Sequence, residues 1–85
     1  MPSPRKSSWT CYLLQCADHT LYCGITNDLA KRLAAHNAGE GAKYTRGRTP
    51  VTLVYQESCA DKSSALKRER EIKALPRADK LALYC

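Results

Sequence analysis

The apolar residues of this chain follow two kinds of pattern, short β-branched or aromatic runs and longer stretches with helical spacing. The short runs predict strands at residues 9–16, 21–25 and 51–55, and a turn at 17–20 joins the first two into a β-hairpin. The helical spacing predicts one helix from residue 27 or 28 to about 37, a second over 61–75 and a terminal helix after Pro76. The pattern therefore predicts a fold of the α/β (α+β) class, with a small sheet and flanking helices.

The first helix carries two basic side chains beside its apolar stripe. Asn27 is expected to cap it, and Leu29 and Leu33 form the stripe. At about 100° per residue, His36 lies roughly 20° and Arg32 roughly 60° from Leu29. An imidazole and a guanidinium at the edge of a packed face could both reach a phosphate on the sheet side. The alternative is a surface arginine next to a boundary histidine with ordinary hydrogen bonds.

Two tyrosines, Tyr12 and Tyr22, lie one on each strand of the predicted hairpin. Because side chains alternate along a strand, both share a face only if the numbers of paired residues add to an even value, as when 16 pairs with 22. The sequence leaves this register open. Two tyrosines on adjacent strands are also common as core or boundary residues.

The second helix has an acidic residue on its apolar face. Asp61 is expected to cap this helix, whose apolar arc contains Ala65, Leu66, Ile72 and Leu75. Glu69 falls inside the arc, whereas Glu71 falls among polar residues, where a carboxylate makes ordinary surface pairs. An acid on a packed face needs a partner, so Glu69 is predicted to hold either a metal ion or a structural partner such as an arginine or a hydroxyl.

The most basic loop of the chain follows the first helix. Three cations surround one aromatic residue there, a composition that can bind phosphates while stacking a base; the residues are Lys43, Tyr44, Arg46 and Arg48. A solvated surface loop is the alternative. The whole chain has 14 Lys and Arg against 8 Asp and Glu, a net charge of +6, which is compatible with a polyanionic partner such as nucleic acid.

Length and composition set further limits. The 85 residues predict one domain over 9–85, preceded by a flexible basic tail over 1–8. Without a membrane-spanning stretch or a signal-peptide core, the expected location is the cytoplasm. Five cysteines without a C-x-x-C pair argue against a disulfide framework. Cys11, Cys16 and Cys23, in the predicted strands, are expected to be buried apolar residues. Zinc at Cys16 and His19 is disfavoured.

Together these residues resemble the GIY-YIG nucleases. Tyr12 and Tyr22 stand ten residues apart, Gly24 follows in Tyr22-Cys23-Gly24, and the resemblance extends over most of Trp9 to Leu83; its further residues are Arg32, His36 and Glu69. The resemblance is closest to the small stand-alone bacterial GIY-YIG proteins, with which residues 41–48 and 70–73 also agree. The sequence departs from the motif names, with Thr10-Cys11-Tyr12 in place of Gly-Ile-Tyr and Cys23 in place of Ile. A late asparagine of several family members has no counterpart, since Asn37 is the last one.

The resemblance implies a GIY-YIG fold with a three-stranded mixed or antiparallel sheet flanked by helices. It also implies a DNA endonuclease in which Glu69 holds Mg²⁺ or Mn²⁺, Arg32 holds the phosphate, and Tyr12 or Tyr22 accepts a proton from the attacking water. His36 would lower the pKa of the tyrosine, orient it or contact the leaving group. The expected catalytic residues are Tyr12, Tyr22, Arg32, His36 and Glu69, and the expected DNA contacts are Lys43, Tyr44, Arg46 and Arg48.

The expected substrate is single-stranded or branched DNA, in repair or recombination, since backbone and shape are what the basic loop could recognise. No membrane and no obligate protein partner is expected. The competing interpretation is a non-catalytic nucleic-acid-binding module that keeps the GIY-YIG fold. In a third interpretation, the domain binds other proteins and owes its charge to solubility.

Overall fold

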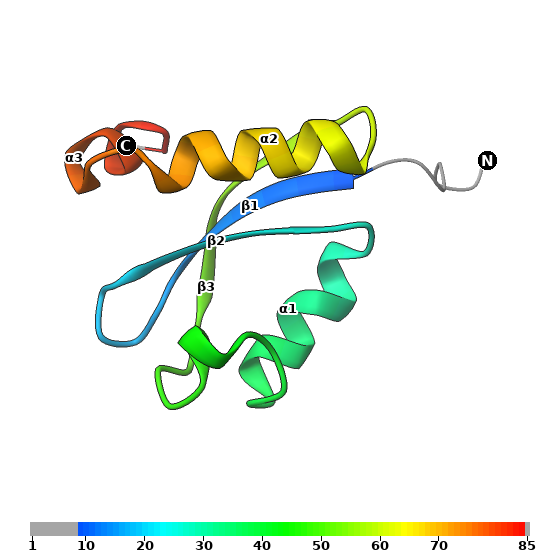
Figure 1. Cartoon of the computed structure of the whole chain (residues 1–85). Helices are drawn as coiled ribbons and strands as arrows, with labels where there is room; N and C mark the ends of the chain where they lie inside the picture. Colours follow the sequence, from blue (N-terminus) through cyan, green and yellow to red (C-terminus); the bar gives the residue numbers. More distant parts are fainter. Residues whose placement is uncertain (1–8, 85) are drawn as a thin grey trace.

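The structure, a computed structural model, describes residues 9–84. The predicted flexible tail at residues 1–8 lies outside these described residues. Three strands and three α-helices follow one another in the predicted order (Figure 1), with a short 3₁₀-helix between the first helix and the last strand. Their bounds are β1 Trp9–Gln15, β2 Leu21–Thr26, α1 Leu29–Asn37, η1 Lys43–Thr45, β3 Thr52–Cys59, α2 Lys62–Lys73 and α3 Arg77–Ala82.

The sheet is antiparallel throughout, with the strand order β2-β1-β3. In the hairpin, Tyr12 pairs with Gly24 and Leu14 pairs with Tyr22, so paired numbers add to 36. This even register places Tyr12 and Tyr22 on the same face of the sheet. The third strand runs to Cys59, well past the predicted end at Tyr55, because β1 continues to pair with it as far as Trp9.

Each face of the sheet has its own small core. The alternation along β1 directs Cys11 and Leu13 toward α2, where they pack with Cys23 and Ile72. Residues of the opposite parity pack on the α1 side, where the buried cluster is Tyr12, Leu14, Cys16 and Val51, flanked by Leu29 and Leu33. Figure 1 shows this arrangement, with α2 above the strands and α1 below them. The hairpin tyrosines therefore belong to the α1 side.

The helix starts show how short-range signals set boundaries. Asp28 caps α1 in place of the predicted Asn27, because its carboxylate accepts the amide hydrogen of Lys31 at 3.2 Å. Asp61 caps α2 as predicted, accepting from the amide of Ser64 at 2.8 Å.

Leu66, assigned to the apolar arc of α2, is 40 % exposed. In the described part of the chain the helices are all too short or too polar to cross a membrane.

Three thiols confirm the prediction of buried, unbridged cysteines. Cys11, Cys16 and Cys23 are all buried and free. The sulfur atoms of Cys11 and Cys23 lie 3.8 Å apart between adjacent strands. They act as small apolar residues of the two cores, as expected for reduced cysteines in strands.

Candidate active site

The centre of the site is a contact between Tyr12 and His36. The Tyr12 hydroxyl oxygen lies 3.0 Å from Nε2 of His36, and the two residues are 1 % and 0 % exposed. The prediction of a boundary position for His36 is therefore wrong. The cause is the segment after α1, which folds back so that Gly41 and Thr45 enclose the imidazole on the side away from the sheet.

A chain of hydrogen bonds assigns the protons in this contact. The hydroxyl of Thr45 donates to the carbonyl oxygen of Ala42 at 2.9 Å, so it accepts from Nδ1–H of His36 at 2.8 Å. Nε2 of His36 is then the acceptor, and the Tyr12 hydroxyl donates its proton to it. Burial lowers the pKa of His36, and the charge of Arg32 adds to this effect, which keeps the imidazole neutral as the assignment requires.

Two glycines make room for this pair. A Cβ on Gly24 would lie 2.6 Å from the Tyr12 hydroxyl oxygen and 2.8 Å from the ring carbon that bears it. A Cβ on Gly41 would overlap the imidazole of His36. Glycine is needed at both positions because a side chain would displace the Tyr12 hydroxyl or the His36 imidazole. The glycine of the sequence motif Tyr22-Cys23-Gly24 thus acts on the opposite strand, against Tyr12.

Arg32, from the middle of α1, supplies the positive charge of the site. Burial raises the pKa of Tyr12, and the guanidinium of Arg32 next to its hydroxyl lowers it by less. The same proximity raises the pKa of Arg32. Arg32 also lines an open hollow of about 170 Å³ at the start of α1, together with Lys31 and the cap residue Asp28. An anion entering this hollow would meet two basic side chains, of which Arg32 also lies beside the Tyr12 hydroxyl.

Tyr22 occupies a different environment from Tyr12. It is half-buried, and its ring centre lies 5.4 Å from that of His36 and 5.8 Å from that of Tyr44, on which it stacks. The guanidinium of Arg48 lies 4.4 Å from the centre of the Tyr44 ring and forms a 2.9 Å ion pair with Asp18. Tyr22 is thus part of an aromatic row, whereas Tyr12 is the tyrosine whose hydroxyl is hydrogen-bonded to the imidazole.

The predicted DNA-contacting residues divide into two pairs. Tyr44 is 42 % exposed and, with Arg48, is fixed against the hairpin. Lys43 and Arg46 are exposed on the same turn. The pair fixed against the hairpin presents a partly exposed aromatic ring, and the exposed pair adds positive charge on the same turn.

Glu69 approaches from the other side of the sheet. Its side chain, 20 % exposed, forms a 3.4 Å ion pair with Lys73, and the ammonium group of Lys73 lies 5.9 Å from the centre of the Tyr22 ring. Lys73 thus connects α2 with the tyrosine side across the edge strand β2. Glu71, by contrast, is 52 % exposed and pairs with Arg68 at 3.3 Å. The two glutamates are in different surroundings, as the helical pattern predicts.

Glu69 is the candidate ligand for a divalent cation. Across residues 9–84, the structure brings together no group of three or more His, Cys, Asp or Glu side chains that could hold a metal ion. A single half-buried carboxylate suits Mg²⁺, which keeps several waters and needs few protein ligands. The donor set therefore fits a hydrated Mg²⁺ or Mn²⁺ and does not fit zinc, which takes three or four nitrogen or sulfur ligands.

Sequence reasoning did not single out Thr45 or Lys73. Thr45 is separated from His36 by a loop without periodicity, so only a fold-level comparison of residues 41–48 could have drawn attention to it. Lys73 lies one helical turn after Glu69, a spacing that identifies it as a possible partner but not as the contact to Tyr22.

Comparison with known proteins identifies the family of the chain. The model of the GIY-YIG catalytic domain matches residues 8–82. The chain therefore belongs to the GIY-YIG family, a nuclease-type family. Among its relatives are two UPF0213 proteins, one of Halobacterium salinarum, 58 % identical over 86 % of this chain and 95 % of the relative, and one of Natronomonas pharaonis, 61 % identical over 81 % of each.

The fold is also similar to that of solved relatives. The solution NMR structure of a UPF0213 protein from Bacillus halodurans is 41 % identical, with a TM-score of 0.57 over 89 % of this chain and 81 % of that chain. A protein from E. faecalis, also solved by NMR, is 39 % identical, with a TM-score of 0.61 over 92 % and 83 %. The UPF0213 name carries no specific activity or substrate.

Proposed function

We propose that this protein is a divalent-metal-dependent endonuclease that hydrolyses phosphodiester bonds of DNA. The observation that carries the proposal is the buried hydrogen-bond chain from Tyr12 through His36 to Thr45, with the guanidinium of Arg32 beside the tyrosine hydroxyl. A purely structural tyrosine and histidine need neither a fixed tautomer nor a neighbouring cation next to an open hollow.

The chain of hydrogen bonds supports Tyr12, and not Tyr22, as the general base. As water attacks phosphorus, the Tyr12 oxygen takes a proton from the water and passes its own proton to Nε2 of His36. The neutral imidazole makes this possible near pH 7, where a tyrosine with an ordinary pKa near 10 would be a poor base. Thr45 holds the imidazole in the accepting tautomer. Arg32 binds the non-bridging oxygens and offsets their charge.

Glu69 would hold Mg²⁺ or Mn²⁺ at the edge of β2. The ion, when bound, supplies Lewis-acid stabilisation of the phosphoryl and leaving oxygens. With the carboxylate charge offset by a bound cation, the Lys73 ammonium, which pairs with Glu69 at 3.4 Å, would be available to the phosphate backbone. Glu71 has no such place in the mechanism, since it faces away with Arg68.

The proposed substrate is single-stranded or branched DNA in repair or recombination within the cytoplasm. The net charge of +6 and the exposed Lys43 and Arg46 support contacts with the backbone. The 42 % exposure of Tyr44 supports contact with an unpaired base. These features recognise shape and single strands and do not read a sequence in a groove.

A second candidate is a nucleic-acid-binding module without turnover. It is favoured by one observation, that no asparagine follows Asn37, whereas several family members have a late one. Phosphate binding by Arg32 and the basic loop would persist in such a module. The two candidates differ only in whether a bond is broken.

The deciding experiment is cleavage of labelled single-stranded, duplex and branched DNA with Mg²⁺, Mn²⁺ or EDTA. Wild type is expected to cut only with metal, Glu69→Ala to bind without cutting, and Glu71→Ala to remain active, since only the first variant removes the proposed ligand. If all three proteins bind DNA and none cuts it, the binding module is the correct function. Equal rates on blunt duplex and single strands would refute the substrate preference.

A further inference from the structure

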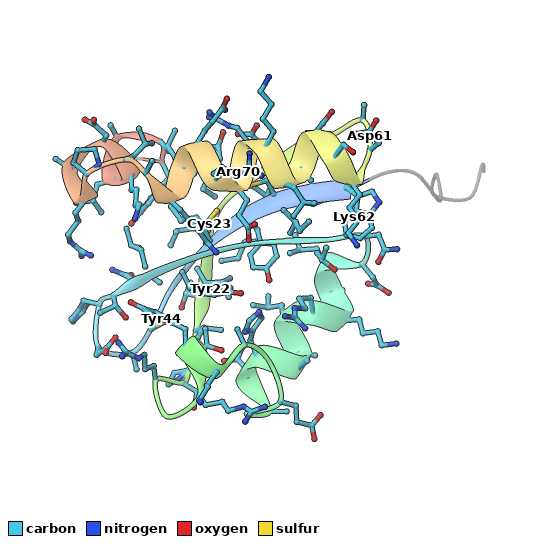
Figure 2. The ribbon with its side chains drawn as sticks, in the orientation of Figure 1. Tyr22, Cys23, Tyr44, Asp61, Lys62 and Arg70 are labelled. Carbon is cyan, nitrogen blue, oxygen red and sulfur yellow. The ribbon has the colours of Figure 1, made fainter. Side chains whose placement is uncertain are left out.

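A second and larger hollow lies around the edge strand β2, next to the proposed cleavage site. It has a volume of about 450 Å³, within the usual range for small-molecule sites. Figure 2 shows Tyr22 and Tyr44 on the α1 side of β2 and Cys23 on the α2 side. We refer to this space as the β2 hollow; its lining residues are Leu13, Leu21, Tyr22, Cys23, Tyr44, Lys73 and Lys80.

The lining of the β2 hollow combines three chemical features. Leu13, Leu21 and Cys23 provide an apolar floor. The stacked pair Tyr22 and Tyr44 provides an aromatic wall. Lys73 and Lys80, from α2 and α3, bring two positive charges to the rim. An apolar floor, an aromatic wall and a cationic rim match the base and phosphate of one nucleotide.

The two lysines are not equivalent. Lys73 is paired with Glu69, whereas the half-buried Lys80 forms neither an ion pair nor a side-chain hydrogen bond within the part of the chain that the structure describes. A lysine can pack its carbon chain on an apolar floor while its ammonium group stays in water, where that group is free to meet an anion. Among the proposed catalytic roles, none uses Lys80, so its position in the hollow is unexplained by the cleavage chemistry alone.

From this geometry we infer that the β2 hollow binds the base and phosphate of one unpaired nucleotide of the strand being cut. The inference rests on the proposed function and adds to it a reason for substrate choice. A base in a duplex is paired and stacked, so it enters the hollow only after it is flipped out, at a cost of a few kcal/mol. Single strands and flaps avoid that cost. The hollow therefore selects unpaired DNA directly beside the reacting phosphate.

The first test is binding of a fluorescein-labelled oligothymidylate in EDTA, followed by anisotropy at several salt concentrations. Lys80→Ala is expected to weaken binding and to reduce the slope of log K against log salt by about 0.7, the loss of one single-strand phosphate contact. Lys67→Ala is the matched control, since Lys67 is exposed on α2 and lies outside the hollow. A blunt duplex is expected to bind with no dependence on Lys80.

The second test is cleavage of oligonucleotides that carry one abasic position, moved stepwise through the cut site. Loss of the stacked base is expected to slow cleavage by about 5-fold or more at one position only. If wild type cuts DNA, but the abasic position does not affect the cleavage rate and Lys80→Ala binds like Lys67→Ala, the nucleotide subsite is refuted and the proposed nuclease activity is retained. If wild type cuts no DNA, the nuclease is wrong, and selective weakening by Lys80→Ala still supports the subsite.

Discussion

Replacing Thr45 by valine tests the role of the buried hydrogen-bond chain in its most direct form. Valine keeps the shape of threonine but removes the oxygen that accepts from Nδ1–H of His36 at 2.8 Å. Thr45 is fully buried, so water cannot take the place of the lost hydroxyl. The imidazole is then left with an unsatisfied donor, or it adopts the other tautomer and no longer accepts from Tyr12.

The magnitude follows from this single lost acceptor. A buried donor without a partner costs about 1–3 kcal/mol, a large part of the roughly 5–15 kcal/mol by which a domain is stable. If the imidazole instead changes tautomer, the cost of about 1–3 kcal/mol lowers the population of the tautomer that accepts from Tyr12. At 1.36 kcal/mol per factor of ten, cleavage then falls by about 5-fold to 150-fold. The Thr45→Ser variant keeps the hydroxyl and should recover most of the stability and most of the cleavage rate.

The assay combines urea unfolding with cleavage of single-stranded DNA, normalised to the folded fraction. Thr52→Val is the matched control, because Thr52 is exposed on β3. The reasoning is refuted if Thr45→Val equals Thr52→Val in both unfolding midpoint and cleavage rate. Thr45→Val keeps the methyl group and removes the hydroxyl, whereas Thr45→Ser keeps the hydroxyl and removes the methyl group. Recovery by Thr45→Ser therefore shows that the hydroxyl is the group that matters.

Two further predictions concern the same pair of rings. Gly24→Ala places a Cβ 2.6 Å from the Tyr12 hydroxyl oxygen, so it should lower the free energy of unfolding by about 1–3 kcal/mol and abolish cleavage; an unchanged urea midpoint would contradict this. Burial lowers the pKa of His36 below its unfolded value near 6.5, so its contribution to stability is complete above that pH and is lost as the pH falls through the lowered pKa. Urea midpoints between pH 4 and 8 should show this loss in wild type but not in His36→Gln.

The strands and helices could be predicted because their signals are local. The apolar and aromatic run at Trp9–Gln15, the turn at 17–20 and the cap at Asp61 each depend on a few neighbouring residues. The extension of β3 to Cys59 could not, because it depends on pairing with Trp9, fifty residues earlier in the chain. The choice between Asn27 and Asp28 as a cap is also decided by backbone geometry, since both residue types cap helices well.

The candidate site could likewise be predicted only in part from the sequence. Helical spacing indicated that Arg32 and His36 lie together and that Glu69 differs from Glu71. The depth of His36 depends on the return of residues 41–45 over the helix end, a contact between segments with no shared periodicity. For the same reason the sequence could not choose between Tyr12 and Tyr22, because only the fold shows that the Tyr12 hydroxyl is the one hydrogen-bonded to the imidazole.

The position of Tyr12 has a consequence for how this family can change over time. Its ring is part of the buried cluster with Leu14, Cys16 and Val51, while its hydroxyl bonds to His36. Under the proposed function, one side chain therefore serves both folding and proton transfer, and most replacements would lose the two together. Phenylalanine is the exception, since it fills the same volume without the oxygen. If the proposed hydrolysis is correct, a relative that has lost it yet remains folded should carry Phe at position 12, a substitution that genome surveys can look for.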